Sequence, residues 1–236
     1  GTMAVSSGKW YAEFLCSESS AGATSIAAIG ILDIGANNAM DGSYFIGYED
    51  NSVSYYGSNG YKFVSYTNTS TYATYGNAWG LGDIIGVALD LDAGTVKFYK
   101  NNTVQNSGTA AASSLSGTFV FGAAVYATSA IIANFGQDSS FAGVGIAQGN
   151  ADGNGVGDFF YAPPSGHLAI CSSNLPDAAI IDGTDHFNTV LWTGTGSGGT
   201  RAVSGVGFSP DWVSAKNLTQ NYSHTLYDSV RGAGND

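Results

Sequence analysis

The chain has 236 residues, of which 34 are glycine and only 11% are charged. Seven basic residues against 18 acidic ones give a net charge of −11, which excludes the clustered positive charge that nucleic acids or anionic lipid surfaces require of a partner. No apolar run is long enough for a membrane-spanning helix, and an aromatic share of 13% argues against disorder, so we expect a folded chain without membrane insertion.

Alternation with a period of two residues begins close to the N-terminus. In KWYAEFLC, the side chains of Trp10, Ala12, Phe14 and Cys16 fall on one side of an extended strand. The following run SIAAIGIL (residues 25–32) is apolar throughout, as in a strand buried on both faces. Both patterns predict β-strands that contribute to one core.

A hairpin is predicted for GDIIGVALDLDAGTVKFYKNN, residues 82–102. Ile85, Val87 and Leu89 share one face of its first strand, and Val96 and Phe98 continue that face on the return strand. Asp92, Ala93 and Gly94 supply the turn between the strands. This pattern is typical of an antiparallel sheet with one face against a core.

Two further strands are expected at residues 118–127 and 130–137, and no helical period precedes residue 140. Short strands separated by glycine-rich turns predict an all-β fold, an antiparallel β-sandwich of the jelly-roll kind, over residues 1–143. Residues 144–165 are rich in glycine and proline and are interpreted as a linker or long loop. Residues 166–236 form a smaller β-rich extension with a thin core, which suggests an incomplete domain or an assembly segment.

Tyrosines are concentrated in one part of the chain. Eight of them lie between Tyr44 and Tyr75, and Trp79 follows. The polar, aromatic segment 67–80 is interpreted as a loop at an end of the sandwich, where binding surfaces are common. Tyrosine and tryptophan stack on sugars and dominate protein interfaces. The residues that we expect to contact a ligand are Tyr72, Tyr75, Asn77 and Trp79.

A calcium site is the one metal site that the sequence suggests. Asp152, Asn154 and Asp158 have the spacing of an oxygen-rich calcium loop, with glycines between them. The glutamate that would close an EF-hand loop is missing, because Pro163 stands at that position. A flexible loop explains the same residues, so both interpretations stay open, and no other cofactor is expected.

Little in the sequence points to catalysis. Glycoside hydrolases on jelly-roll folds need paired carboxylates, and no E-x-D-x-E strand pattern occurs. Asp90 and Asp92 share a face, but Asp92 stands at a turn, where aspartate is common. The chain is therefore predicted not to be an enzyme, with a carbohydrate-active enzyme as the alternative. Cys16 and Cys171 are expected to be small buried residues, although a disulfide between them stays possible.

Three ordered motifs resemble those of the SPRY domain family. They are SGKWYAEF, the hairpin GDIIGVALDLDAGTVKFYKNN, and IIANFGQ, and together they span about residues 7–141. Asn102 replaces the glycine that usually ends the hairpin motif, and asparagine tolerates the same left-handed backbone. The resemblance implies a bent sandwich of two antiparallel sheets that acts as a non-catalytic recognition module and binds partners through loops at one end.

The C-terminal part, about residues 168–234, resembles segments that follow SPRY domains in tail and structural proteins of bacteriophages. This resemblance implies a component of a phage tail fibre or a similar appendage, located on the virion or an extracellular surface. The expected partners are a host-surface protein or glycan and other appendage subunits, including further copies of the same chain. The alternative is a self-assembling architectural subunit of a virion or surface layer.

Overall fold

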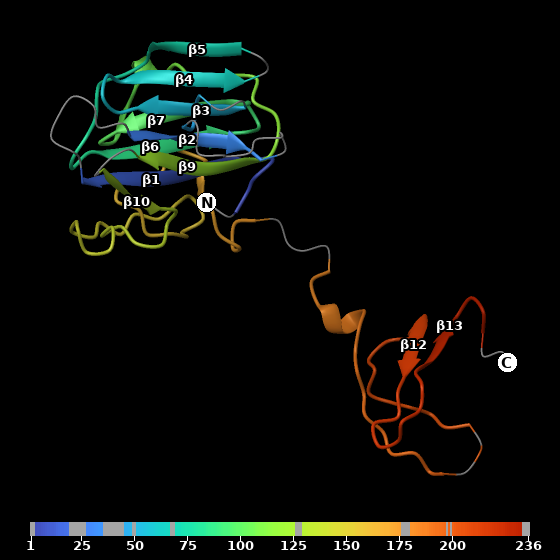
Figure 1. Cartoon of the computed structure of the whole chain (residues 1–236). Coiled ribbons are helices and arrows are strands. Elements are labelled where there is room, and N and C mark those ends of the chain that lie inside the picture. Colours follow the sequence, from blue (N-terminus) through green and yellow to red (C-terminus); the bar gives the residue numbers. More distant parts are fainter. Residues whose placement is uncertain are drawn as a thin grey trace. The chain divides into compact units, whose positions relative to one another are not determined.

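A computed structural model divides the chain into two compact units, Gly1–Leu175 and Pro176–Asp236, each of which is described by itself (Figure 1). It describes residues 3–18, 27–34, 45–48, 51–66, 69–125, 129–175, 180–196, 198 and 200–232, and within these the side chains of Tyr66, Thr69 and Ser70 are left out. No helix in these ranges is long and apolar enough to cross a membrane. The first unit extends past the predicted linker at 144–165.

Two sheets build the first unit. The first sheet has the strand order β10-β1-β6-β7-β8, and β11 joins it as a parallel partner of β1. Its strands are β1 (Lys9–Glu18), β6 (Ile84–Asp90), β7 (Thr95–Lys100), β8 (Thr103–Val104), β10 (Ala130–Asn134) and β11 (Leu168–Ala169). A short 3-10 turn, η1 (Asn106–Gly108), follows β8.

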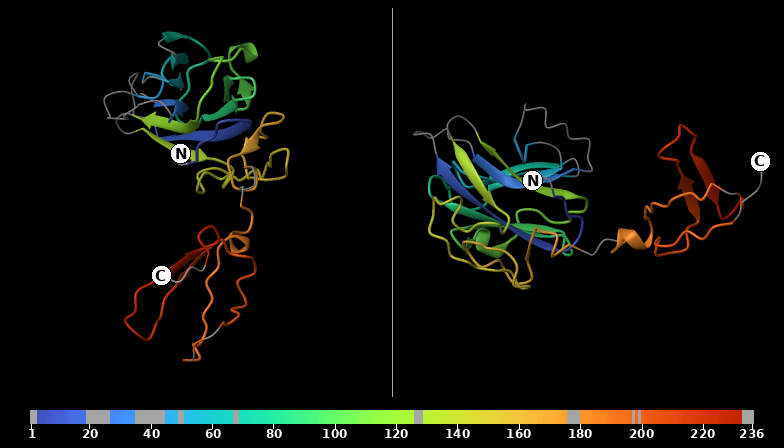
Figure 2. Two further views of the ribbon diagram at one scale, coloured as in Figure 1. Left: turned by 90° about the vertical axis from the view of Figure 1, so that its right-hand side faces the viewer. Right: turned by 90° about the horizontal axis from the view of Figure 1, so that it is seen from below.

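The second sheet has the strand order β5-β4-β3-β2-β9, and all of its pairs are antiparallel. Its strands are β2 (Ala27–Asp33), β3 (Ser52–Tyr56), β4 (Tyr61–Tyr66), β5 (Thr69–Thr74) and β9 (Phe119–Val125). The two sheets lie face to face as layers in both views of Figure 2. The predicted all-β antiparallel sandwich is confirmed; the strand ends expected at 25–26 and 126–127 lie outside the described residues.

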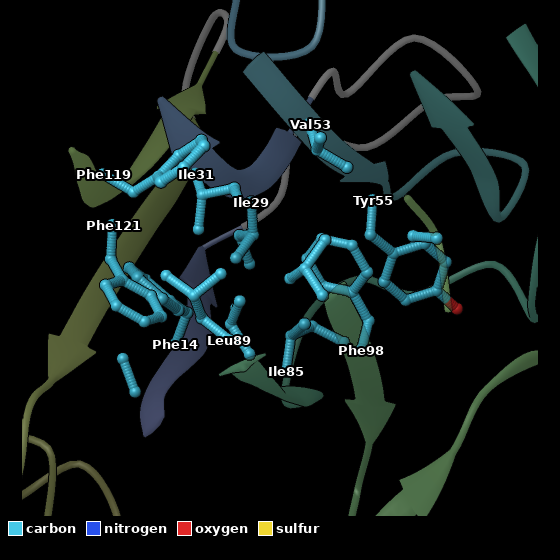
Figure 3. Close-up of a cluster of buried hydrophobic side chains, with 14 of the residues drawn as sticks. Phe14, Ile29, Ile31, Val53, Tyr55, Ile85, Leu89, Phe98, Phe119 and Phe121 are labelled. Atoms are coloured by element: carbon cyan, nitrogen blue, oxygen red, sulfur yellow. The ribbon is translucent and has the colours of Figure 1, made fainter. Parts of the chain in front are cut away.

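The core fills the space between the sheets, as Figure 3 shows. The first sheet contributes the alternating residues of β1, β6 and β7 that the sequence pattern predicted, including Phe14, Leu89 and Phe98. The second sheet contributes Ile29 and Phe121 among others. Because the period-two pattern assigned these residues to one face of each strand, apolar burial fixes the register of both sheets.

β2 and β3 approach each other too closely for a side chain at Gly30. A Cβ atom added there would lie 1.9 Å from the carbonyl oxygen of Val53 and 2.8 Å from the Cα atom of Ser54. Both contacts are with backbone, which cannot rotate away. Glycine at this position therefore permits the close pairing of the central strands of the second sheet.

The outer face of the first sheet is covered by residues 136–175, which we call the arm and which rejoin that sheet as β11 (Figure 1). Phe159 and Ala169 of the arm are buried against Tyr11 and Ala88 of the sheet, and the rings of Tyr11 and Phe159 meet edge to face at 5.3 Å. Phe141 packs against Leu15 in a second cluster. The arm thus covers the outer face of β1, whose inner face lies in the core, and this explains why that strand is buried along most of its length.

Glu13 lies between β1 and the arm, and its carboxylate is fully buried. One oxygen, Oε2, accepts a hydrogen bond from the backbone N–H of Phe160 at 2.8 Å, and Oε1 accepts one from the N–H of Tyr161 at 2.8 Å. The Asn134 amide and the Tyr11 hydroxyl each donate a further hydrogen bond at 3.3 Å. Burial raises the pKa of Glu13 to about 7, and the four hydrogen bonds oppose this rise.

Asn134, the buried last residue of β10, directs the chain from the sheet into the arm. Its Oδ1 atom accepts hydrogen bonds from the N–H groups of Gly136, Gln137 and Asp138, at 2.8, 3.0 and 3.2 Å. Its amide nitrogen donates to Glu13 and, at 2.9 Å, to the carbonyl of Asp158. Asn134 therefore fixes the beginning of the arm, and Glu13 fixes the place where the arm returns across the sheet.

The second unit contains little regular structure. Its described elements are the 3-10 turn η2 (Gly183–Asp185) and a hairpin of β12 (Trp212–Ala215) and β13 (Thr225–Asp228). The hairpin is antiparallel and pairs Trp212 with Asp228 and Ala215 with Thr225. The expected small β-rich extension is therefore present as a single hairpin among the described residues.

Replacing Gly30 with alanine should destabilise the first unit, since the new methyl group must displace backbone of β3. We expect a loss of about 1–3 kcal/mol in the free energy of unfolding, as for other overpacked cores. Gly153→Ala is the matched control, because a Cβ atom at Gly153 meets nothing within 4 Å. Chemical denaturation of both variants measures the difference, and equal stability would contradict the close approach of β2 and β3.

Stability should decrease as the pH rises from 4.5 to about 7, because the folded chain holds the Glu13 proton more tightly than the unfolded chain does. The pKa of Glu13 rises from 4.5 to about 7 on folding. At about 1.4 kcal/mol for each pKa unit, the full effect is about 3 kcal/mol. It is present below pH 4.5, is lost through the interval up to the folded pKa, and is constant above it.

Glu13→Gln cannot ionise, so it should remove this part of the pH dependence. His167, whose pKa is lowered by burial, titrates in the same interval with the opposite sign and is present in both proteins. The contribution of Glu13 is therefore the difference between the denaturation profiles of the wild type and the variant. Parallel profiles would show that another group titrates.

Candidate functional site

The segment predicted as an end loop, residues 67–80, is only partly a loop. Thr69–Thr74 form β5, the edge strand of the second sheet, and Phe63 of β4 lies opposite Tyr72. Threonine and tyrosine favour extended backbone, and the free edge of β4 offers hydrogen-bond partners. Tyr72 therefore lies on a sheet face and not on a loop; Thr67 and Asn68 lie outside the described residues.

Two of the four expected contact residues belong to the core, which corrects that prediction. Tyr75 and Trp79 are only 3% and 6% exposed. Their rings pack against Tyr55, at 5.6 Å for Tyr75 and 6.1 Å for Trp79. Trp79 also covers Gly57, where an added Cβ atom would lie 3.3 Å from the indole ring. Both residues stabilise the sandwich and cannot reach a ligand at its surface.

Asn77 lies between these buried rings, and its side chain is exposed. Its backbone N–H donates to Gln105 Oε1 at 2.9 Å, and its carbonyl accepts a hydrogen bond from the Tyr55 hydroxyl. The loop is therefore fixed to the core through its backbone. A ligand contact by the Asn77 side chain stays a prediction.

Tyr72 is part of an aromatic surface on the outer side of β3, β4 and β5, which we call the aromatic face. Val53, Tyr55 and Val64 point into the core, so the alternate residues of these strands point outward. The segment 45–48 packs beside them. The aromatic face consists of Phe45, Tyr48, Tyr56, Tyr61, Phe63 and Tyr72.

The rings of the aromatic face contact one another in a continuous series. Phe63 lies near its middle, with its ring centroid 4.3 Å from that of Tyr72, 5.3 Å from that of Tyr56 and 5.0 Å from that of Phe45. Tyr61 lies 4.6 Å from Tyr72 on the other side. Such spacings make the rings a rigid surface, because each side chain is held by its neighbours.

Two rings of this series, one near each end, are open to solvent. Tyr72 is 53% exposed and Tyr48 is 55% exposed, while the other four rings are partly buried. The Asn59 amide donates a hydrogen bond of 2.6 Å to the Tyr72 hydroxyl and orients it. Burial raises the pKa of Tyr56, so its hydroxyl is uncharged at neutral pH. The face can therefore stack on a flat apolar ligand surface and exchange hydrogen bonds at its rim.

The sequence analysis identified the tyrosine-rich region but did not distinguish the aromatic residues that face the core from those that face the surface. Alternation along β4 already places Tyr61 and Phe63 on one side, and Tyr72 joins them once β5 is recognised as a strand. The part played by Phe45 could not be predicted, because it depends on contact between distant segments. Tyr44 and the side chain of Tyr66 lie outside the described residues.

The predicted calcium loop has a structural explanation in its own hydrogen bonds. Asp152 Oδ1 accepts hydrogen bonds from the N–H groups of Asn154 and Val156, at 2.9 and 3.0 Å. Its Oδ2 accepts from the Ala169 N–H at 2.8 Å and the Asn174 amide at 2.7 Å. In the described ranges, no three His, Cys, Asp or Glu side chains gather as metal ligands. Calcium binding by Asp152, Asn154 and Asp158 stays a prediction.

The carboxylates that the enzyme alternative would need form hydrogen bonds or ion pairs within the fold. Asp90 forms an ion pair of 2.9 Å with Lys9, and Asp92 accepts a hydrogen bond of 2.9 Å from the N–H of Gly8. Glu13 has the raised pKa that is typical of catalytic groups, but its oxygens face backbone N–H donors of the arm. Cys16 and Cys171 are both free thiols.

Comparisons with known proteins agree with the motifs. The family model of the SPRY domain matches residues 10–138, which confirms the resemblance of the three motifs. A second model, described as a domain of unknown function (DUF7483), matches residues 182–236. No curated protein matches the chain.

Among solved structures, the chain is similar to the SPRY domain of human HERC1. The two share 16% sequence identity with a TM-score of 0.42, and the match covers 56% of this chain and 74% of that one.

Replacement by alanine should destabilise the protein much more at Trp79 than at Tyr72. Trp79→Ala leaves a cavity beside Tyr55 and should cost about 3–5 kcal/mol of the free energy of unfolding. Tyr72→Ala removes a half-exposed ring and should cost about 1 kcal/mol or less. Thermal denaturation of the two variants tests the assignment, which fails if Trp79→Ala is the milder change.

Proposed function

This chain belongs to the SPRY domain family, whose members are protein-interaction modules and typically non-catalytic, and we propose that its sandwich is the recognition part of a phage tail fibre or similar surface appendage. In this proposal the module binds a protein or a glycan on the surface of a host. This proposal rests mainly on the aromatic face, six adjoining rings of which Tyr48 and Tyr72 are exposed.

The composition of the aromatic face supports a binding role. Aromatic rings that are held by their neighbours lose little conformational freedom when a ligand covers them, so more of the contact energy remains as affinity. Tyrosine hydroxyls add hydrogen-bonding groups at the same surface, and tyrosine is enriched at binding hot spots for this reason. The same features suit the apolar faces of sugar rings.

Charge narrows the class of ligand. The chain carries a net charge of −11, so a strongly anionic ligand would be repelled over the distance of approach. We therefore propose a neutral or cationic partner, such as an uncharged polysaccharide or a basic protein segment. A location on the virion or another extracellular surface belongs to the same proposal, and it rests on the resemblance of the C-terminal segment to phage structural proteins.

The test is binding of the labelled full chain to cells of candidate hosts, with the double variant Tyr48→Ala/Tyr72→Ala as the probe of the face. Loss of two hot-spot rings should weaken binding at least about tenfold, equivalent to about 1.4 kcal/mol. The matched control is Leu81→Ala/Ile146→Ala, which removes two exposed apolar side chains elsewhere on the first unit. Equal binding by the two double variants would refute the aromatic face as the contact surface.

Treatment of the cells distinguishes the two kinds of receptor. Periodate, which oxidises sugar diols, should abolish binding if the ligand is a glycan, whereas protease treatment should abolish it if the ligand is a protein. Each variant is first checked for an unchanged melting temperature, so that a loss of binding reports on the surface and not on folding. If the wild-type chain binds none of the candidate host cells, the proposed role in a surface appendage is contradicted.

A further inference from the structure

The second unit differs from the first in that no residue of its described part is fully buried. Every described residue from 180 to 232 is exposed or only partly buried. Many of these residues are large and apolar, and five of them are aromatic rings between 46% and 68% exposed: Phe187, Trp192, Trp212, Tyr222 and Tyr227. Single exposed apolar residues are ordinary, but a unit that exposes most of its large apolar residues needs a partner to cover them.

The β12–β13 hairpin shows that both of its faces need cover. The pairing places Trp212 and Leu226 on one face, and Val213 and Tyr227 on the other. All four side chains are at least 40% exposed. A hairpin with one solvated face would carry apolar residues on the opposite face alone. This hairpin has the pattern of strands enclosed on two sides, and a two-stranded hairpin by itself is marginal in water.

The exposed area fits an interface of ordinary size. A Phe, Tyr or Trp ring that becomes buried removes about 150–250 Å² from water, so five half-exposed rings offer roughly 500 Å². Ile181, Leu191 and Val230 add apolar surface, since each is at least 87% exposed. A stable interface buries about 800 Å² on each partner, which is close to this total.

Charge opposes contact between two second units less than it opposes contact between two first units. The second unit has six aspartates and three basic side chains, a net charge of −3, whereas the first unit carries the remaining −8 of the chain's −11. Arg231 is already paired with Asp228 at 2.6 Å. Two second units therefore repel each other more weakly than two first units do.

We propose that the second unit assembles with the same unit of a second copy of this chain, so that the two copies pool their apolar side chains into one shared core. The surface comprises both faces of the β12–β13 hairpin and the rings around it. Obligate homodimer interfaces resemble a domain core cut in half, and the second unit has that composition. The chain is accordingly at least a dimer, and recognition by the sandwich becomes multivalent.

The test is sedimentation velocity of the full chain from nanomolar to micromolar concentration, together with hydrogen exchange at both ends of that range. We expect a dimer or larger species that dissociates on dilution, and amide protection at residues 212–228 that increases with concentration. The double variant Trp212→Ser/Tyr227→Ser removes one ring from each face of the hairpin and should weaken association at least tenfold.

The matched control is Leu81→Ser, a polar replacement at an exposed apolar residue of the first unit, which should leave association unchanged. The unfolding transition of the sandwich serves as an internal standard for all variants. A wild-type chain that stays monomeric across the range overturns the proposal, whether the hairpin is then protected by its own chain or awaits a different protein. Association that survives the double variant equally overturns it. Neither result depends on host binding, so the recognition role of the aromatic face is tested separately.

Discussion

The hydrogen bonds between the Glu13 carboxylate and the backbone of the arm are the interaction on which the architecture of the first unit depends. A carboxylate beneath a sheet layer loses its hydration, and the N–H groups of Phe160 and Tyr161 would lose theirs in the same place. Each group supplies what the other lacks, across 147 positions of sequence. Asn134 donates a further hydrogen bond to the carboxylate and also shapes the turn that begins the arm. Residues of the first and the last SPRY motif in the sequence therefore meet at one buried point.

The arm decides which surfaces of the sandwich remain available. It covers the outer face of the first sheet with Phe141 and Phe159, and that face therefore has no exposed platform of its own. On the second sheet, the outward residues of β3, β4 and β5 stay at the surface as the aromatic face. A single covering layer thus separates a stabilising side of the sandwich from a side that can meet a ligand.

The two units differ in how their apolar side chains are shielded from water. The first unit buries its rings between sheets and beneath the arm, with Tyr55, Phe98 and Phe121 among the fully enclosed ones. The second unit leaves Trp212 and Tyr227 on opposite faces of one hairpin, where only another chain segment can cover both. In the two proposals, recognition and assembly are carried by separate parts of the chain, so a sequence change in one need not disturb the other.

The sequence by itself determined the sandwich, because alternation along β1, β6 and β7 specifies which residues face the core whatever their partners are. It also located the tyrosine-rich region, and Tyr72 within it. Only the tertiary structure decided that Tyr75 and Trp79 belong to the core, that β5 extends the second sheet, and that Glu13 holds the arm. These outcomes depend on contacts between residues far apart in the chain, such as Glu13 with Phe160, and local periodicity carries no information about which distant segment will cover a face.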